Sequence, residues 1–165
     1  MSNGFKNLED KRTKPLRLTN CVLFIVEMVL FAFPYIAMID SEGNYHFKTI
    51  LELILGMNAE DNKWIKLGLL AIAFAIIPIV GFFVTAFDKN SCVKSFFGCV
   101  CSFAGIFCLV FLVPQFSPQL AFGAMAAIII YLLIFAISVS LALKTVAIRA
   151  MKRKEQEKIA EHNEA

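Results

Sequence analysis

The sequence predicts an all-α membrane protein in which four transmembrane helices form an antiparallel bundle, with a short amphipathic helix in the first outer loop. Three observations lead to this fold class. Apolar residues make up 59% of the chain, above the roughly 45–50% of ordinary soluble domains. They are concentrated in four long blocks separated by short polar segments. Charged residues, 18% of the chain, lie mostly at the two ends and in one loop.

Each apolar block is long enough to cross a bilayer as a helix, which takes about 20 residues. The predicted spans cover residues 18–39, 64–87, 93–113 and 119–143. Pro34 lies near the outer end of the first span, where a kink is tolerable, and Pro78 lies inside the second, where it removes one backbone hydrogen bond.

The transmembrane domain at residues 18–143 is flanked by two polar segments. Residues 1–17 form a basic arm without helical periodicity, which we expect to be mobile or to lie on the surface. Residues 144–165 form a charged tail, in which Arg153 and Glu157 have the i,i+4 spacing of a helical ion pair. We expect this tail to prolong the fourth helix into water.

The loop at residues 40–63 contains the one amphipathic pattern outside the spans. Gly56 is a plausible helix C-cap, and the stretch before it is too short to cross a membrane. The apolar residues at helical spacing are Phe47, Ile50, Leu51, Ile54 and Leu55. They predict a short helix lying in the outer membrane interface. A strand is the alternative, because Tyr45, Phe47, Leu51, Leu53 and Leu55 also alternate; Ile50 and Ile54 would then face the wrong side, which favours the helix.

Charge distribution predicts one orientation. Lys and Arg are concentrated in the arm, the loop at residue 88 and the tail, whereas the two loops on the opposite side carry few bases. By the positive-inside rule both termini are cytoplasmic. The short loops, without glycosylation sequons on the outer side, favour a bacterial inner (cell) membrane.

Small residues predict how the spans pack, since close backbone approach drives helix association in lipid. The third span has the stripe Ser95, Gly98, Ser102 and Gly105. The second span has Gly68, Ala71 and Ala75, and the fourth has Ala124, Ala127, Ala136 and Ser140.

Glu27 is the one acidic residue deep inside a predicted span. It lies about 14 Å from the start of the first span, near the bilayer midplane. Desolvation disfavours a charged carboxyl there, so we expect it to be neutral for much of the time. Ser102, Tyr131 and the Phe74 carbonyl, freed by Pro78, are the hydrogen-bond partners expected at a similar depth.

Three roles for Glu27 remain open from the sequence. It could fix helix register through a hydrogen bond, serve a proton- or cation-coupled site, or pair with a base of another membrane protein. Small multidrug transporters are similar in having four spans and a glutamate midway along the first. The similarity is limited to that placement, because this chain is longer and has an additional outer loop and a basic tail.

No motif indicates catalysis, a metal or a cofactor. The five cysteines lack zinc-site or C-x-x-C spacing, and we interpret them as small buried residues, with acylation of Cys21 or Cys92 as the alternative. The net charge of +3 follows from basic flanks beside spans and does not indicate nucleic-acid binding.

The sequence therefore favours a non-enzymatic assembly, scaffold or regulatory subunit of a membrane complex. The alternative is a small proton- or cation-coupled transporter or channel component that uses Glu27. The expected partners are the bilayer and either another membrane protein or a second copy of the chain. Ordinary positive-inside flanking explains the juxtamembrane bases, and contact with anionic lipid is the alternative. These bases are Arg149, Lys152, Arg153 and Lys154.

Overall fold

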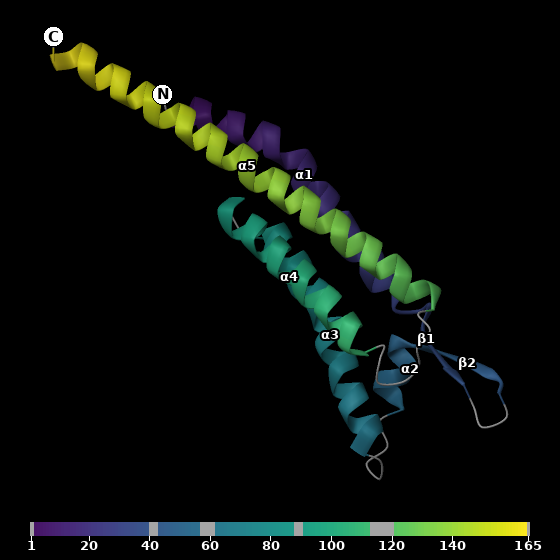
Figure 1. Cartoon of the computed structure of the whole chain (residues 1–165). Helices are drawn as coiled ribbons and strands as arrows, with labels where there is room; N and C mark the ends of the chain where they lie inside the picture. Colours follow the sequence, from purple (N-terminus) through teal and green to yellow (C-terminus); the bar gives the residue numbers. More distant parts are fainter. Residues whose placement is uncertain (1, 40–42, 57–61, 88–90, 113–120, 165) are drawn as a thin grey trace.

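The computed structural model describes residues 2–39, 43–56, 62–87, 91–112 and 121–164. Most of these residues are helical, as Figure 1 shows. The elements in chain order are α1 (Ser2–Leu30), β1 (Pro34–Ile39), β2 (Tyr45–Thr49), α2 (Ile50–Leu55), α3 (Asn62–Phe87), α4 (Ser91–Leu112) and α5 (Phe122–Glu164). The predicted connections at residues 88–90 and 114–118 lie outside the described residues.

Four long helices make up the body of the molecule. α1 packs against α3 and α5, and α4 packs against the same two helices. Figure 1 shows α1 and α5 running side by side in opposite directions, with both termini at the same end of the molecule. Among the described residues, α3, α4 and α5 are long and apolar enough to cross a membrane.

The predicted helix over residues 18–39 is wrong in its outer part. α1 ends at Leu30, and a turn follows in which the Phe33 amide donates to the Leu30 carbonyl over 2.8 Å. Pro34 has no amide hydrogen and disfavours helical geometry in the residue before it, so the chain leaves the turn as a strand. The apolar part of α1, residues 18–30, is therefore only about 20 Å long.

The chain after this turn forms a hairpin. β1 and β2 pair antiparallel, with Ala37 opposite Phe47, and the start of β1 is held by a 3.3 Å hydrogen bond from the Ala121 amide to the Tyr35 carbonyl. Tyr35, Ile36 and Ala37 are buried, which explains why β1 is uniformly apolar. We call β1, β2 and α2 together the hairpin cap.

The predicted interfacial helix begins later than expected. Residues 45–49 are strand β2, so Phe47 belongs to the sheet, and the helix starts at Ile50. Thr49 fixes this start through a capping box, because its hydroxyl accepts from the Glu52 amide at 3.1 Å while the Glu52 carboxylate accepts from the Thr49 amide at 2.8 Å. Gly56 ends the helix as predicted. Residues 45–55 thus form a strand followed by a helix, whereas the sequence predicted one or the other for the whole segment.

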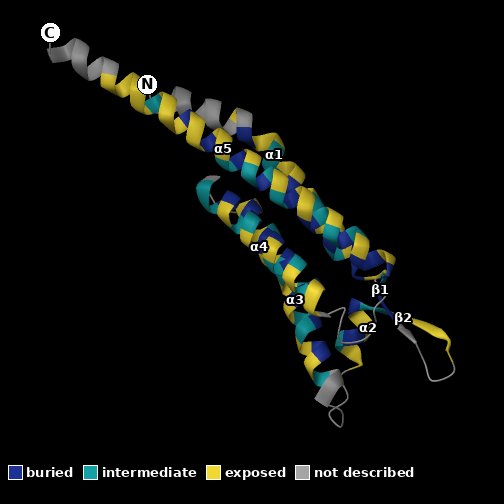
Figure 2. Ribbon diagram, viewed as in Figure 1, coloured by how far each residue is buried: buried dark blue, intermediate teal, exposed yellow. Residues whose placement is uncertain are grey.

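Small residues set the contact between α4 and α5. Ser95, Gly98, Ser102 and Gly105 are all buried, as the stripe predicts. A Cβ at Gly98 would collide with Ser138, and one at Gly105 would collide with the ring of Tyr131. The predicted packing role of Ala136 and Ser140 is wrong, because both are exposed. Figure 2 shows buried and exposed residues alternating along these helices.

α1 and α5 extend well past their apolar parts. α5 continues as a helix to Glu164, as predicted for the tail, and its 43 residues measure about 64 Å. The expectation of an aperiodic arm at residues 1–17 is wrong, because α1 is helical from Ser2. We call the paired polar parts, residues 11–17 of α1 and 144–157 of α5, the terminal stalk.

Candidate polar site around Glu27

Glu27 lies in the last full turn of α1 and is 0% exposed. Its Oε1 accepts a hydrogen bond of 3.3 Å from the Tyr35 hydroxyl of β1. The residues around it include Phe74 and Tyr131, which lie about halfway along the apolar parts of α3 and α5.

Four aromatic rings, from the turn after α1 and from β1, α3 and α5, enclose the site. Phe74 of α3 is central: its ring centroid lies 5.7 Å from those of Phe31 and Tyr35 and 5.9 Å from that of Tyr131. The contacts with Tyr35 and Tyr131 are edge-on, the geometry that aromatic quadrupoles favour. All four rings are buried. The carboxyl of Glu27 therefore lies in a closed, largely apolar environment.

Two polar atoms in this enclosure have no hydrogen-bond partner among the described residues, namely Glu27 Oε2 and the hydroxyl of Tyr131. The two side chains lie near each other. Leaving a buried polar group without a hydrogen-bond partner costs about 1–3 kcal/mol. Buried polar groups without a partner are therefore rare in proteins. The site thus combines an acid and a phenol, each with unused hydrogen-bonding capacity.

The structure brings together some of the predicted site residues and separates others. Tyr131 lies near Glu27, but the expected hydrogen bond between them is absent, because the Tyr131 hydroxyl has no partner among the described residues. Ser102 does not pair with Glu27; its hydroxyl donates to the Gly98 carbonyl of its own helix at 2.8 Å. Pro78 is buried one turn beyond Phe74, and Phe74 contributes its ring to the enclosure.

Tyr35 was missed in the sequence analysis. In a continuous helix over residues 18–39 it would lie about 12 Å beyond Glu27 along the axis. The turn after Leu30 reverses this separation and directs the phenol back to the carboxyl. Pro34 was the available signal, since the residue before a proline is a common helix boundary.

A second polar contact ties α1 to α5 further toward the termini. The Asn20 side-chain amide donates to the Ser138 hydroxyl at 3.0 Å, and both residues are buried. Gly98 of α4 lies against the same pair, where any side chain would collide with Ser138. Asn20 Oδ1 has no partner among the described residues. This contact fixes the register of three helices.

Most of the other predicted residues are exposed. In the hairpin cap, Ile50 is buried, Ile54 is half-buried, and Phe47, Leu51 and Leu55 are exposed, Leu55 by 85%. In the stalk, Lys152 is half-buried, whereas the other predicted bases, Arg149, Arg153 and Lys154, are exposed.

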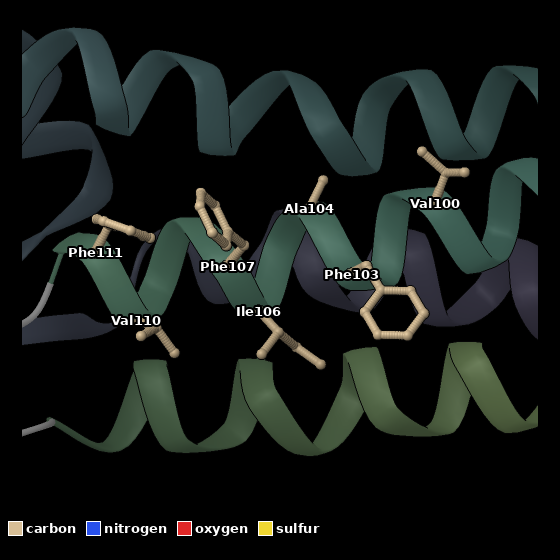
Figure 3. A pocket seen from close by; sticks show the side chains of 7 residues that line it. All are labelled: Val100, Phe103, Ala104, Ile106, Phe107, Val110 and Phe111. Carbon is tan, nitrogen blue, oxygen red and sulfur yellow. The ribbon is translucent and has the colours of Figure 1, made fainter.

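An apolar groove runs along the exposed side of α4, as Figure 3 shows. The rings of Phe107 and Phe111 contact each other in a tilted arrangement with centroids 4.3 Å apart, and Phe103 contacts Phe135 of α5. Aliphatic and aromatic side chains of this kind suit contact with acyl chains. The lining residues are Val100, Phe103, Ala104, Ile106, Phe107, Val110 and Phe111.

Within the described part of the chain, no group of three or more His, Cys, Asp and Glu side chains could hold a metal ion. All five cysteines are free thiols, and Cys21 and Cys92 are half-buried. No protein-family model, curated protein or solved structure matches this chain.

Proposed function

We propose that this chain is a non-enzymatic subunit of a membrane complex, an assembly, scaffold or regulatory partner whose docking surface is the terminal stalk. The observation that carries the proposal is the continuation of α1 and α5 as a helix pair beyond their apolar parts. α5, about 64 Å long, is roughly twice the 30 Å needed to cross the hydrocarbon core. A helix used only to cross the membrane has no need of this length.

Packing supports the stalk as an ordered element. Thr13 of α1 and Thr145 of α5 are fully buried, and Ile148 is only 4% exposed. The Thr145 hydroxyl donates to the Leu141 carbonyl at 2.8 Å, so its polar atom is satisfied inside the pair. Burial at successive turns holds the two helices together and presents their other faces to partners.

Charge supports a docking role for those faces. The exposed stalk residues include Lys11, Lys14, Arg149, Arg153 and Lys154, against the acids Glu155 and Glu157. A rigid surface rich in bases suits the acidic surface of another membrane protein, because charge complementarity steers association and selects partners. The anionic headgroups of the bilayer are a further attraction for the bases nearest the membrane.

The position of the termini supports four crossings. α3, α4 and α5 alone would leave the start of α3 and the C-terminus on opposite sides of the membrane. A fourth crossing by residues 18–39 accounts for the N-terminus and the C-terminus lying at the same end of the molecule. The helical part of this segment, residues 18–30, is about 20 Å long, and a bilayer can thin locally around a short hydrophobic helix. Positive-inside charge favours cytoplasmic termini, and the short loops without glycosylation sequons on the outer side favour a bacterial inner membrane.

Charge reversal in the stalk tests the proposal. We expect Arg149→Glu with Arg153→Glu to dissociate the chain from its complex in native membranes, seen as a shift to a smaller species in native electrophoresis after mild detergent extraction. The matched control, Lys48→Glu with Lys66→Glu, makes the same change of charge at the other end of the molecule and should leave the complex intact. An unchanged complex in the stalk variant, or equal loss in both, contradicts a docking role for the stalk.

The second candidate function is a small proton- or cation-coupled transporter or channel component. It is supported by one observation, the buried Glu27 carboxyl with an unpaired Oε2 beside the unpaired Tyr131 hydroxyl. Reconstituted proteoliposomes distinguish the two functions. Ion or proton flux that is lost in Glu27→Gln favours transport, whereas the same flux in wild type, variant and empty vesicles eliminates it.

A further inference from the structure

The surroundings of Glu27 suit a carboxylic acid better than a carboxylate. A buried carboxylate is stable when a cation or several donors compensate its charge. Here the single hydrogen bond comes from Tyr35 at 3.3 Å, and Oε2 has no partner among the described residues. A neutral acid needs no counter-charge, and its proton supplies a donor that the site otherwise lacks.

Tyr131 offers the complementary acceptor. Its hydroxyl is fully buried, has no described hydrogen-bond partner and lies near Glu27. A phenol oxygen can accept a hydrogen bond as well as donate one. The ring is confined by Phe74 on one side and by Gly105, which leaves no room for a side chain, on the other. Small rotations of the carboxyl and the hydroxyl are therefore the available route to a hydrogen bond.

We propose that Glu27 Oε2 is a proton-binding site whose occupied form connects α1 to Tyr131 of α5 and, through Oε1, to Tyr35 of β1, and so keeps the hairpin cap closed. The proton joins α1, β1 and α5 through side chains, in addition to the backbone hydrogen bond from Ala121 to Tyr35 at the start of α5. The role is independent of docking by the terminal stalk, which lies at the opposite end of the molecule.

No other charged group in the described structure faces this carboxyl. The titratable side chains around it are Tyr35 from β1 and Tyr131 from α5, and α4 adds the thiols of Cys101 and Cys108 next to Tyr131. α3 contributes Phe74, which does not titrate. Protonation of Glu27 is therefore the one charge change expected to act on the hairpin cap through this site.

The direction of the pH dependence follows from proton linkage. When the hairpin cap opens, Glu27 reaches water, where a glutamate carboxyl has an ordinary pKa of about 4.3 and ionises. Above that pH each opening releases a proton, so acid stabilises the closed form and rising pH favours the open form. The opening equilibrium can grow by up to about tenfold per pH unit while the covered carboxyl stays protonated.

Infrared spectroscopy of the full-length protein in vesicles of neutral phospholipid tests the proton itself. The carbonyl stretch of a protonated carboxyl is distinct from carboxylate bands. We expect wild type at neutral pH to have such a band, Glu27→Gln to lack it, and Tyr131→Phe and Tyr35→Phe each to shift its frequency. The absence of a band that depends on Glu27, or a band unaffected by Tyr131→Phe, would overturn the proposal.

Hydrogen exchange over residues 34–49 tests the closing of the hairpin cap. Between about pH 5 and about pH 7, the ratio of wild-type to Glu27→Gln exchange rates should rise, by up to about tenfold per pH unit. Intrinsic base catalysis cancels in this ratio because both chains share the peptide. Glu157→Gln, which neutralises an exposed glutamate on α5, should exchange like wild type. Tyr131→Phe, which keeps the acid and removes its acceptor, should exchange faster at every pH. A ratio that is constant with pH contradicts the link between the proton and the hairpin cap.

Discussion

Gly105→Ala is the sharpest test of the packing between α4 and α5. A Cβ at this position would lie within 3.0 Å of three carbon atoms of the Tyr131 ring. The ring is fully buried and makes an edge contact with Phe74, with centroids 5.9 Å apart, so it has little freedom to move away. Overpacking of this kind costs typically 1–3 kcal/mol, and the confinement of the ring places the cost near the upper value.

The net effect is smaller than the steric cost, because alanine is the better helix former. Replacing a helical glycine by alanine contributes about 1 kcal/mol of stability. Against a steric cost of about 3 kcal/mol, we expect Gly105→Ala to lower the free energy of unfolding by about 2 kcal/mol. Reversible unfolding of the purified protein in mixed micelles with increasing SDS measures this difference.

A double-mutant cycle isolates the steric contact from the general effect of the substitution. In a Tyr131→Ala background the ring is gone, so Gly105→Ala should stabilise the protein by about 1 kcal/mol through helix propensity alone. Ala136→Val, on the exposed face of α5, is the control for added side-chain volume and should be nearly neutral. If Gly105→Ala is neutral or stabilising in the wild-type background, the close approach of α4 to α5 at Tyr131 is refuted.

Three further predictions concern the other contacts that hold the fold together. Ser138→Ala removes the 3.0 Å hydrogen bond from Asn20 and should lower the free energy of unfolding by about 0.6–1.7 kcal/mol in the same SDS assay. An unchanged free energy of unfolding would show that the contact between α1 and α5 does not depend on this hydrogen bond. Thr49→Ala breaks the capping box of α2 and should cost about 1 kcal/mol of local stability, measured as about fivefold faster hydrogen exchange of the Glu52 amide. An unchanged exchange rate would contradict a stabilising role of the capping box. Ile148→Asp places a charge inside the terminal stalk, so spin labels on its two helices should move apart; an unchanged distance distribution would show that the helices are not held by this burial.

The long apolar helices and the tail were predictable because their signals are local. Composition and block length identify α3, α4 and α5, and the stripe of Ser95, Gly98, Ser102 and Gly105 identifies the face of α4 that packs. The same logic failed for Ala136 and Ser140, which have equally small side chains but face outward. Small size permits close approach, and only the neighbouring helices determine where it is used.

The hairpin cap was less predictable because local signals conflict there. Residues 45–56 fit a helical and an alternating pattern at once, and the choice of strand for 45–49 depends on β1, the strand with which they pair. In an apolar segment such as residues 31–39, hydropathy alone does not distinguish helix from strand. The local stop signal was Pro34, whose missing amide makes a helix boundary favourable without requiring one.

By itself the sequence determined that this is a helical protein of membrane character, with its charges gathered at the ends and one acid, Glu27, deep in an apolar segment. These properties depend on composition and spacing along the chain. Only the tertiary structure decided what surrounds Glu27. Tyr35, eight residues further along the chain, reaches it because the chain turns after Leu30. Tyr131, more than one hundred residues away, reaches it because α5 packs beside α1. The chemistry of a buried carboxyl depends on such neighbours, because the groups that desolvate it and share its proton come from distant parts of the chain.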